Sequence, residues 1–242
     1  MNDLQMIECQ LDPAALLRFL RGQGLDDPGR DPDFGYGVHA WLKAAFGDQA
    51  PRPWRRLADR KRPARVLAYG AAGADTLTGR MRDFADPTVL AVCPPEAIAS
   101  KPLPAFHEGR VLDFELLGCP VGRKARSGIE KDLFLLHADR EPDARLDRGQ
   151  IYCDWARERL QVDHAATIER LALTGHRQVR QLRKHQGAPG ERRIKRPTRP
   201  EALFHGRLQV RDPEGFQRLL ARGIGRHRAF GYGMLLLRPP GD

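Results

Sequence analysis

The sequence predicts an α+β fold with two tandem ferredoxin-like (βαββαβ, RRM-like) domains, each a small sheet with helices on one face. Two observations predict it. The same order of strand, Asp-Pro, helix and glycine occurs near both ends of the 242-residue chain. Between these copies, the stretch 94–109 is rich in proline, which is typical of a domain boundary. We therefore expect domains at 1–98 and 106–242.

The N-terminal copy begins with residues 4–11 (LQMIECQL), which alternate enough to predict a strand. Asp12 is a favourable helix N-cap and Pro13 suits a first helical turn, so a helix with an apolar stripe over 16–20 is expected next. A glycine two or four residues later can end that helix.

The C-terminal copy repeats this order. Residues 202–210 alternate as a strand does, Asp212 and Pro213 predict a helix start, and Gly223 is a stop signal. The apolar run 233–237 then predicts a buried strand.

The middle of the chain supplies the remaining elements. Residues 64–72, 87–93 and 110–119 have the composition of strands. Residues 130–146 and 151–161 have helical patterns.

The charge balance indicates a polyanionic partner. The chain has 41 Lys and Arg against 31 Asp and Glu, a net charge of +10, and its hydrophobic fraction of 41% supports a packed core. Such an excess favours nucleic acid over membrane, and no stretch approaches 18 apolar residues.

The cysteines, at positions 9, 93, 119 and 153, lie far apart and form no C-x-x-C pair, so a cysteine zinc site is not expected. They are typical of reduced thiols in a cytoplasmic protein, and the N-terminus does not have the pattern of a signal peptide. No Walker loop, H-E-x-x-H motif or acidic cluster occurs, so we expect no metal or other cofactor.

Most of the excess charge lies in residues 177–199, which hold nine basic residues and one acid. The sequence GAPG at 187–190 predicts a turn between two basic arms. Such a hairpin suits contact with a phosphate backbone; the alternative is a solvated surface loop. The basic residues taken as candidate RNA contacts are Arg180, Arg183, Lys184, Arg192, Arg193, Lys195 and Arg196.

Residues 32–48 (PDFGYGVHAWLKAAFGD) predict an amphipathic helix. Its apolar residues fall on one stripe, while Tyr36, His39 and Lys43 gather on the opposite side and would face solvent or a cleft. Histidine exchanges protons near neutral pH, which suits general acid or base catalysis. The alternative is an ordinary exposed surface histidine.

The segment GIGRHRAFGYGMLLL at 223–237 combines glycine with positive charge. Glycines let a backbone approach phosphates closely, and Arg226 and Arg228 add charge. The alternative is an ordinary glycine-rich turn from helix to strand. The candidate RNA-binding residues here are Gly223, Gly225, Arg226, Arg228 and Gly231.

These segments resemble the CRISPR RNA-processing endoribonucleases of the type I-E Cascade system, the CasE family. The strongest match is residues 202–239, which look like that family's closing strand, Asp-Pro helix and glycine-rich loop. The second is YGVHAWLKAAF, similar to its early helix with a catalytic histidine. The resemblance assigns catalysis to His39 with Tyr36 as its helper. Lys43 is a candidate RNA contact on chemical grounds, because its amine could position the phosphate or assist proton transfer.

The resemblance implies a metal-independent enzyme that binds the hairpin of a CRISPR repeat RNA and cuts the 3′ base of its stem. The products would be a 2′,3′-cyclic phosphate and a 5′-hydroxyl. The protein would then stay with the mature crRNA beside other Cascade subunits, with no DNA-specific site and no membrane contact. A non-catalytic RNA-hairpin-binding assembly subunit is the alternative.

The chain also departs from the family. His205 stands where the late strand usually has an acidic residue, and LLGCPVGRKAR at 116–126 replaces a stretch containing Arg and Asn-Pro. Arg228 falls where the glycine loop usually has a lysine.

Overall fold

The computed structural model describes residues 4–25, 33–59, 62–123, 128–186 and 192–241. The chain forms two compact units. The first comprises Met1–Pro104, Gln181–Lys195 and Ala229–Gly231, and the second comprises Ala105–Arg180, Arg196–Arg228 and Tyr232–Asp242. The division into domains at 1–98 and 106–242 stays a prediction.

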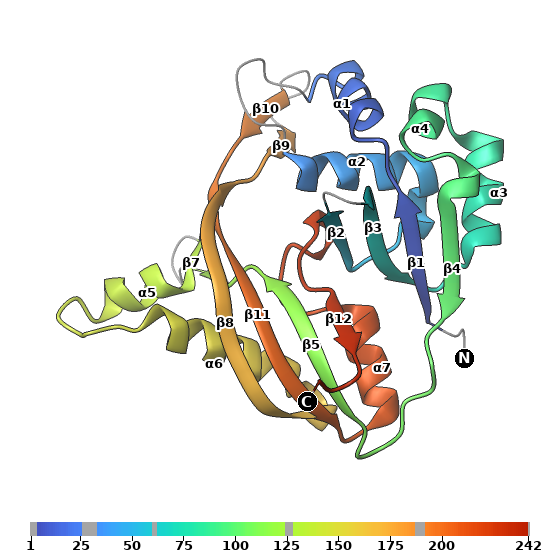
Figure 1. Cartoon of the computed structure of the whole chain (residues 1–242). Coiled ribbons are helices and arrows are strands. Elements are labelled where there is room, and N and C mark those ends of the chain that lie inside the picture. Colours follow the sequence, from blue (N-terminus) through green and yellow to red (C-terminus); the bar gives the residue numbers. More distant parts are fainter. Residues whose placement is uncertain (1–3, 26–32, 60–61, 124–127, 187–191, 242) are drawn as a thin grey trace. The chain divides into compact units, whose positions relative to one another are not determined.

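A four-stranded antiparallel sheet forms the centre of the first unit (Figure 1). The strands lie in the order β2-β3-β1-β4. Their bounds are β1 Gln5–Gln10, β2 Trp54–Asp59, β3 Arg62–Gly70 and β4 Ile98–Pro102. The first and third strands lie in the centre of the sheet, and the second and fourth lie at its edges. This is the arrangement of a βαββαβ unit.

Helices connect β1 to β2 and β3 to β4. Their bounds are α1 Pro13–Gly22, α2 Phe34–Phe46, η1 Gly47–Gln49, α3 Ala74–Phe84, α4 Pro87–Val92 and η2 Pro95–Ala97. Trp41 of α2 is fully buried, and its Nε1 donates to the carbonyl of Val89 at 3.1 Å. This bond joins α2 to α4 inside the core.

The Asp-Pro signal starts two helices in this unit. Asp12 accepts from the N–H groups of Ala14 and Ala15 at 2.8 and 3.0 Å, which confirms the predicted start of α1. Asp86 caps α4 in the same way, so the strand predicted at 87–93 is wrong. The cap and the proline that follows it outweigh the β-branched residues of this short segment.

The second unit repeats the architecture around the sheet β12-β5-β11-β8 (Figure 1). Its strands are β5 Val111–Gly118, β8 Ala166–Arg180, β11 Thr198–Val210 and β12 Leu235–Arg238. The crossovers contain α6 Arg148–Leu160 and α7 Pro213–Arg222. The strand order again places the first and third strands in the centre, so the predicted fold of two tandem ferredoxin-like units is confirmed.

Smaller elements complete the described chain. In the second unit these are β6 Val121–Arg123, β7 Glu130–Asp132, α5 Leu133–Arg140 and η3 Val162–His164. The short helix η4 is Arg228–Phe230; its first residue belongs to the second unit and the other two belong to the first. The first unit also contains β9 Arg183–Gln186 and β10 Arg192–Lys195, which pair antiparallel.

The helix predicted at 130–146 is wrong at both ends, because a strand precedes the helical part and turns follow it. The carboxylate of Asp132 is buried and accepts from the N–H of Phe134 at 2.9 Å. It also accepts from Tyr152 Oη at 2.7 Å and Arg148 Nη1 at 3.0 Å. These bonds fix the helix start at residue 133.

Candidate active site

Helix α2 has two chemically distinct faces, as predicted. Asp33 Oδ1 accepts from the backbone N–H of Tyr36 at 2.9 Å and caps the helix. Val38, Trp41, Leu42 and the residues that follow on that stripe are buried. His39 is half-buried on the other side and Lys43 is exposed, so the predicted orientation of the histidine helix is confirmed.

Aromatic rings surround His39. The Phe230 ring lies 4.7 Å from the imidazole centroid at a tilt of 51°, and Tyr36 meets it edge-on at 6.1 Å. Tyr36 and Phe230 also stack on each other at 6.0 Å. A Cβ at Gly35 would lie 3.0 Å from the Phe230 carbonyl oxygen, so glycine at position 35 permits this close approach. Sequence reasoning missed Phe230, although it stands inside the glycine-rich segment.

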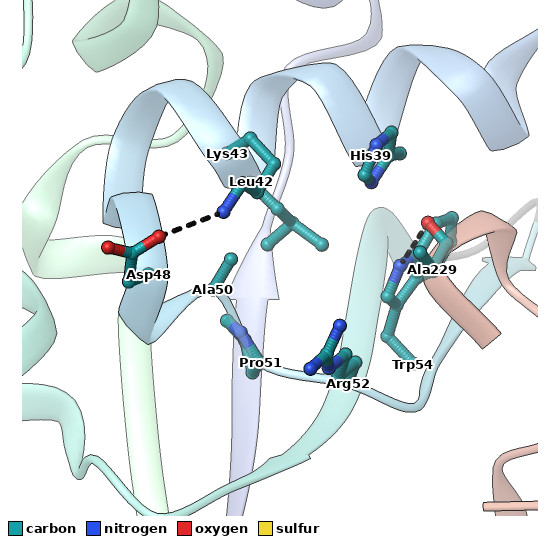
Figure 2. A pocket seen from close by; sticks show the side chains of 9 residues that line it. All are labelled: His39, Leu42, Lys43, Asp48, Ala50, Pro51, Arg52, Trp54 and Ala229. Atoms are coloured by element: carbon teal, nitrogen blue, oxygen red, sulfur yellow. Dashed lines mark hydrogen bonds and ion pairs between the residues drawn. The ribbon is translucent and has the colours of Figure 1, made fainter.

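His39 and Lys43 line one pocket of about 390 Å³. Arg52 and Trp54 line it from the segment after α2, and Ala229 lines it from the glycine-rich segment (Figure 2). The indole Nε1 of Trp54 donates to the Ala229 carbonyl at 3.0 Å, which holds that segment at the pocket wall. The pocket therefore combines an imidazole, an amine and a guanidinium with the carboxylate of Asp48, which also lines it.

Gly231 has a structural reason to be glycine. Its φ is +91°, a conformation that side chains rarely adopt, and a Cβ there would lie 2.9 Å from the Trp54 ring. The close packing brings the backbone of 229–231 against the pocket. RNA contact by Gly231 stays a prediction.

Asp33 also connects α2 to the basic segment. Its second oxygen, Oδ2, accepts from the backbone N–H of Leu182 at 2.6 Å, and Leu182 is buried. One carboxylate thus accepts hydrogen bonds from the first turn of the histidine helix and from the residue just before β9.

We expect Asp33→Ala to lower the free energy of unfolding by about 1–3 kcal/mol, because a helix cap is lost and a part-buried N–H is left without its acceptor. Chemical denaturation measures this change. Asp33→Asn is the matched control and should lower the free energy of unfolding by less, because its amide oxygen still accepts one hydrogen bond. Equal stability of Asp33→Ala and the wild type would contradict this role.

The other end of the glycine-rich segment lies in the second unit and packs differently. Gly223 ends α7, and Gly225 lies against the indole of Trp155. Arg228 donates to the carbonyl of Arg222. Gly223, Gly225 and Arg228 therefore have intramolecular roles, and their RNA contact stays a prediction.

Glu130 forms ion pairs with three basic side chains of the second unit. Its carboxylate lies 2.9 Å from Arg199 Nη2, Arg226 Nη1 and His227 Nε2. Partial burial alone would raise the pKa of Glu130, but the charges of His227, Arg226 and Arg199 outweigh burial and lower it. Part of the charge of Arg226 is thus neutralised within the fold, and RNA binding by Arg226 stays a prediction.

We expect Glu130→Gln to lower the free energy of unfolding by about 1–3 kcal/mol at pH 7, because Arg199 and His227 lose their carboxylate partner. The pKa of Glu130 is lower in the folded state, so its stabilisation is present above the ordinary value of 4.5 and is lost as pH falls through the folded pKa. Denaturation at several pH values should show the variant and the wild type converging in acid. A difference that is constant with pH would contradict this account.

The basic segment is described in part. Residues 183–186 pair with 192–195 through the backbone, so the two predicted arms form a hairpin-like ribbon. The predicted GAPG turn at 187–190 lies outside the described residues. Arg180 is exposed and Arg196 is half-buried. RNA contact by the segment stays a prediction.

Within the described ranges, no group of three or more His, Cys, Asp and Glu residues is placed to hold a metal ion. No helix in those ranges is long and apolar enough to cross a bilayer.

The sequence model of the family described as CRISPR associated protein matches residues 6–239. The chain belongs to this family. The resemblance found in the sequence is thus confirmed at the family level.

One relative is described as CRISPR-associated endoribonuclease Cse3 of Thermus thermophilus. This chain is 29% identical to it over 212 residues, which cover 84% of this chain and 90% of the relative.

Solved structures share the fold. Thermus thermophilus Cse3 bound to an RNA representing a pre-cleavage complex matches with a TM-score of 0.60 and 22% identity, covering 98% of this chain and 100% of that chain. A chain of a CRISPR RNA-guided surveillance complex, pre-nicking, matches with a TM-score of 0.57 and 16% identity, covering 97% of this chain and 100% of that chain.

Proposed function

We propose that this protein is a metal-independent endoribonuclease that binds the hairpin of a CRISPR repeat RNA, cleaves it at the 3′ base of the stem and stays on the mature guide RNA as a Cascade subunit. The observation that carries the proposal is the pocket in which His39 and Lys43 lie together, in a chain of the CRISPR associated protein family. The relative named endoribonuclease and the solved RNA and surveillance complexes support the substrate and the partners.

The chemistry needs no group from outside the chain and the RNA. The 2′-hydroxyl beside the scissile phosphate loses its proton and its oxygen bonds to phosphorus. The bond from phosphorus to the 5′-oxygen breaks, and that oxygen gains a proton. An imidazole can take the first proton or supply the second, and such proton transfer typically contributes about 10²–10⁴-fold. His39 is the imidazole that lines the pocket.

Tyr36 and Lys43 support this step. The Tyr36 ring forms a T-shaped arrangement with the imidazole and helps to set its orientation. Lys43 Nζ donates to the Gly47 carbonyl at 2.9 Å and lies 3.4 Å from the fully exposed Asp48. Exposed ion pairs of this kind are weak, so the amine can exchange Asp48 for a phosphate.

Binding of the stem is assigned to the basic ribbon. β9 and β10 carry Arg183, Lys184, Arg192, Arg193 and Lys195. Double-stranded RNA is recognised mostly through its shape and phosphates, and such binding weakens steeply with salt.

Incubation with the repeat RNA of the neighbouring CRISPR array tests the proposal. We expect one cut at the 3′ base of the stem, and no cut when the stem is disrupted by mismatches. Restoring the stem with compensating changes should restore cleavage. Tight binding without any cleavage would leave the protein as a non-catalytic assembly subunit.

A further inference from the structure

Arg52 lies in the pocket with His39, although no pattern in the sequence singles it out. It stands between Pro51 and Pro53, which are both buried. The N–H of Tyr69 donates to the Pro53 carbonyl at 3.0 Å and joins this loop to β3. Proline rings restrict the backbone on both sides of Arg52, so the point from which its side chain extends is held in place at the pocket.

The guanidinium of Arg52 is available to a ligand. Its side chain is exposed, and in the part of the chain that the structure describes no carboxylate forms an ion pair with it. Lys43, by contrast, already contacts Asp48 and the Gly47 carbonyl. Figure 2 shows the Arg52 side chain among the residues that line the pocket with His39.

Guanidinium chemistry fits one demand of the reaction that His39 does not meet. During cleavage, negative charge builds on the non-bridging oxygens of the phosphate. Arginine stays charged and presents paired N–H donors that match two phosphate oxygens. Donors fixed where charge develops are often the largest single contribution to catalysis.

We propose that Arg52 binds the non-bridging oxygens of the scissile phosphodiester and stabilises the charge of the phosphorane, while His39 exchanges a proton. The assignment rests on the proposed function. Arg52 forms no covalent bond and transfers no proton in this step. The ligand that we assign to Arg52 is an RNA phosphodiester.

Single-turnover cleavage of the repeat hairpin by Arg52→Ala, Arg52→Lys and the wild type tests this assignment. Loss of one such donor typically costs about 10²–10³-fold in rate, and we expect that loss in Arg52→Ala. The cleavage rate of Arg52→Lys should lie between the rates of the wild type and Arg52→Ala, because lysine keeps the charge and loses the paired donors. Arg18→Ala removes an exposed arginine of α1 outside the pocket and should cleave like the wild type.

A sulfur substitution separates direct contact from a structural role. When sulfur replaces the non-bridging oxygen that Arg52 binds, cleavage by the wild type should become slower. Cleavage by Arg52→Ala should be slowed much less by the same replacement. Cleavage by Arg52→Ala at the rate of Arg18→Ala would overturn the assignment. The same sulfur effect in Arg52→Ala and the wild type would also overturn it.

Two further results make the outcome unambiguous. Thermal unfolding should be unchanged in Arg52→Ala because the side chain is exposed, and Arg52→Gln provides a second neutral variant if Arg52→Ala does not fold. If His39→Ala stops cleavage while Arg52→Ala and Arg52→Gln do not slow it, only the assignment of Arg52 fails. If the wild type does not cut the hairpin, the proposed function itself fails.

Discussion

Replacing His39 by alanine should slow cleavage of the repeat hairpin by about 10²–10⁴-fold and leave binding of the RNA unchanged. The imidazole lines the pocket and contacts Phe230 and Tyr36, whereas the opposite face of α2 packs in the core. The fold should therefore tolerate the loss. Single-turnover rates on denaturing gels measure cleavage, and filter binding with a 2′-deoxy substitution at the cut site measures affinity.

His107→Ala is the matched control, because His107 is an exposed histidine of the second unit that does not line the pocket. It should cleave like the wild type. If His39→Ala cleaves as fast as His107→Ala, position 39 has no part in the chemistry.

Replacing the basic residues of the ribbon by glutamine should weaken hairpin binding on the order of 100-fold or more, because phosphate contacts dominate affinity. Each lost contact should also make the plot of log affinity against log salt less steep by about 0.9 units. Titrations between low and high salt measure both effects. The five residues to replace are Arg183, Lys184, Arg192, Arg193 and Lys195.

A variant with the same loss of charge at exposed positions outside the ribbon is the control for this prediction. It should keep most of the affinity and of the salt slope. If both variants weaken binding equally, net charge alone would explain the affinity. The control positions are Arg18, Arg82, Lys101, Arg145 and Arg222.

The sequence predicts the helices that begin with Asp-Pro because the signal is local. Asp12 and Asp212 each accept backbone N–H bonds within three residues, so no distant contact is needed to start α1 or α7. The same signal starts α4 at Asp86, but the apolar run 87–93 favours a strand when it is considered alone. The sequence analysis does not predict β8, although its exposed and half-buried residues alternate from Arg170 to His176.

The candidate site could be predicted only where one helix carries it. The spacing of His39 and Lys43 on α2 places both on one face, and the structure places both in one pocket. Arg52 comes from a loop, and Phe230 comes from a segment almost two hundred residues further along the sequence. Their approach depends on tertiary packing around Trp54, which no local pattern encodes.

The most direct measurement is the chemistry of the cut ends, made with repeat RNA in the presence of a chelator. The account predicts full cleavage in the chelator, a 2′,3′-cyclic phosphate on one product, a 5′-hydroxyl on the other, and no cut in RNA that lacks the 2′-hydroxyl at that position. Inhibition by the chelator with rescue by Mg²⁺, or cleavage of the 2′-deoxy RNA, would contradict it.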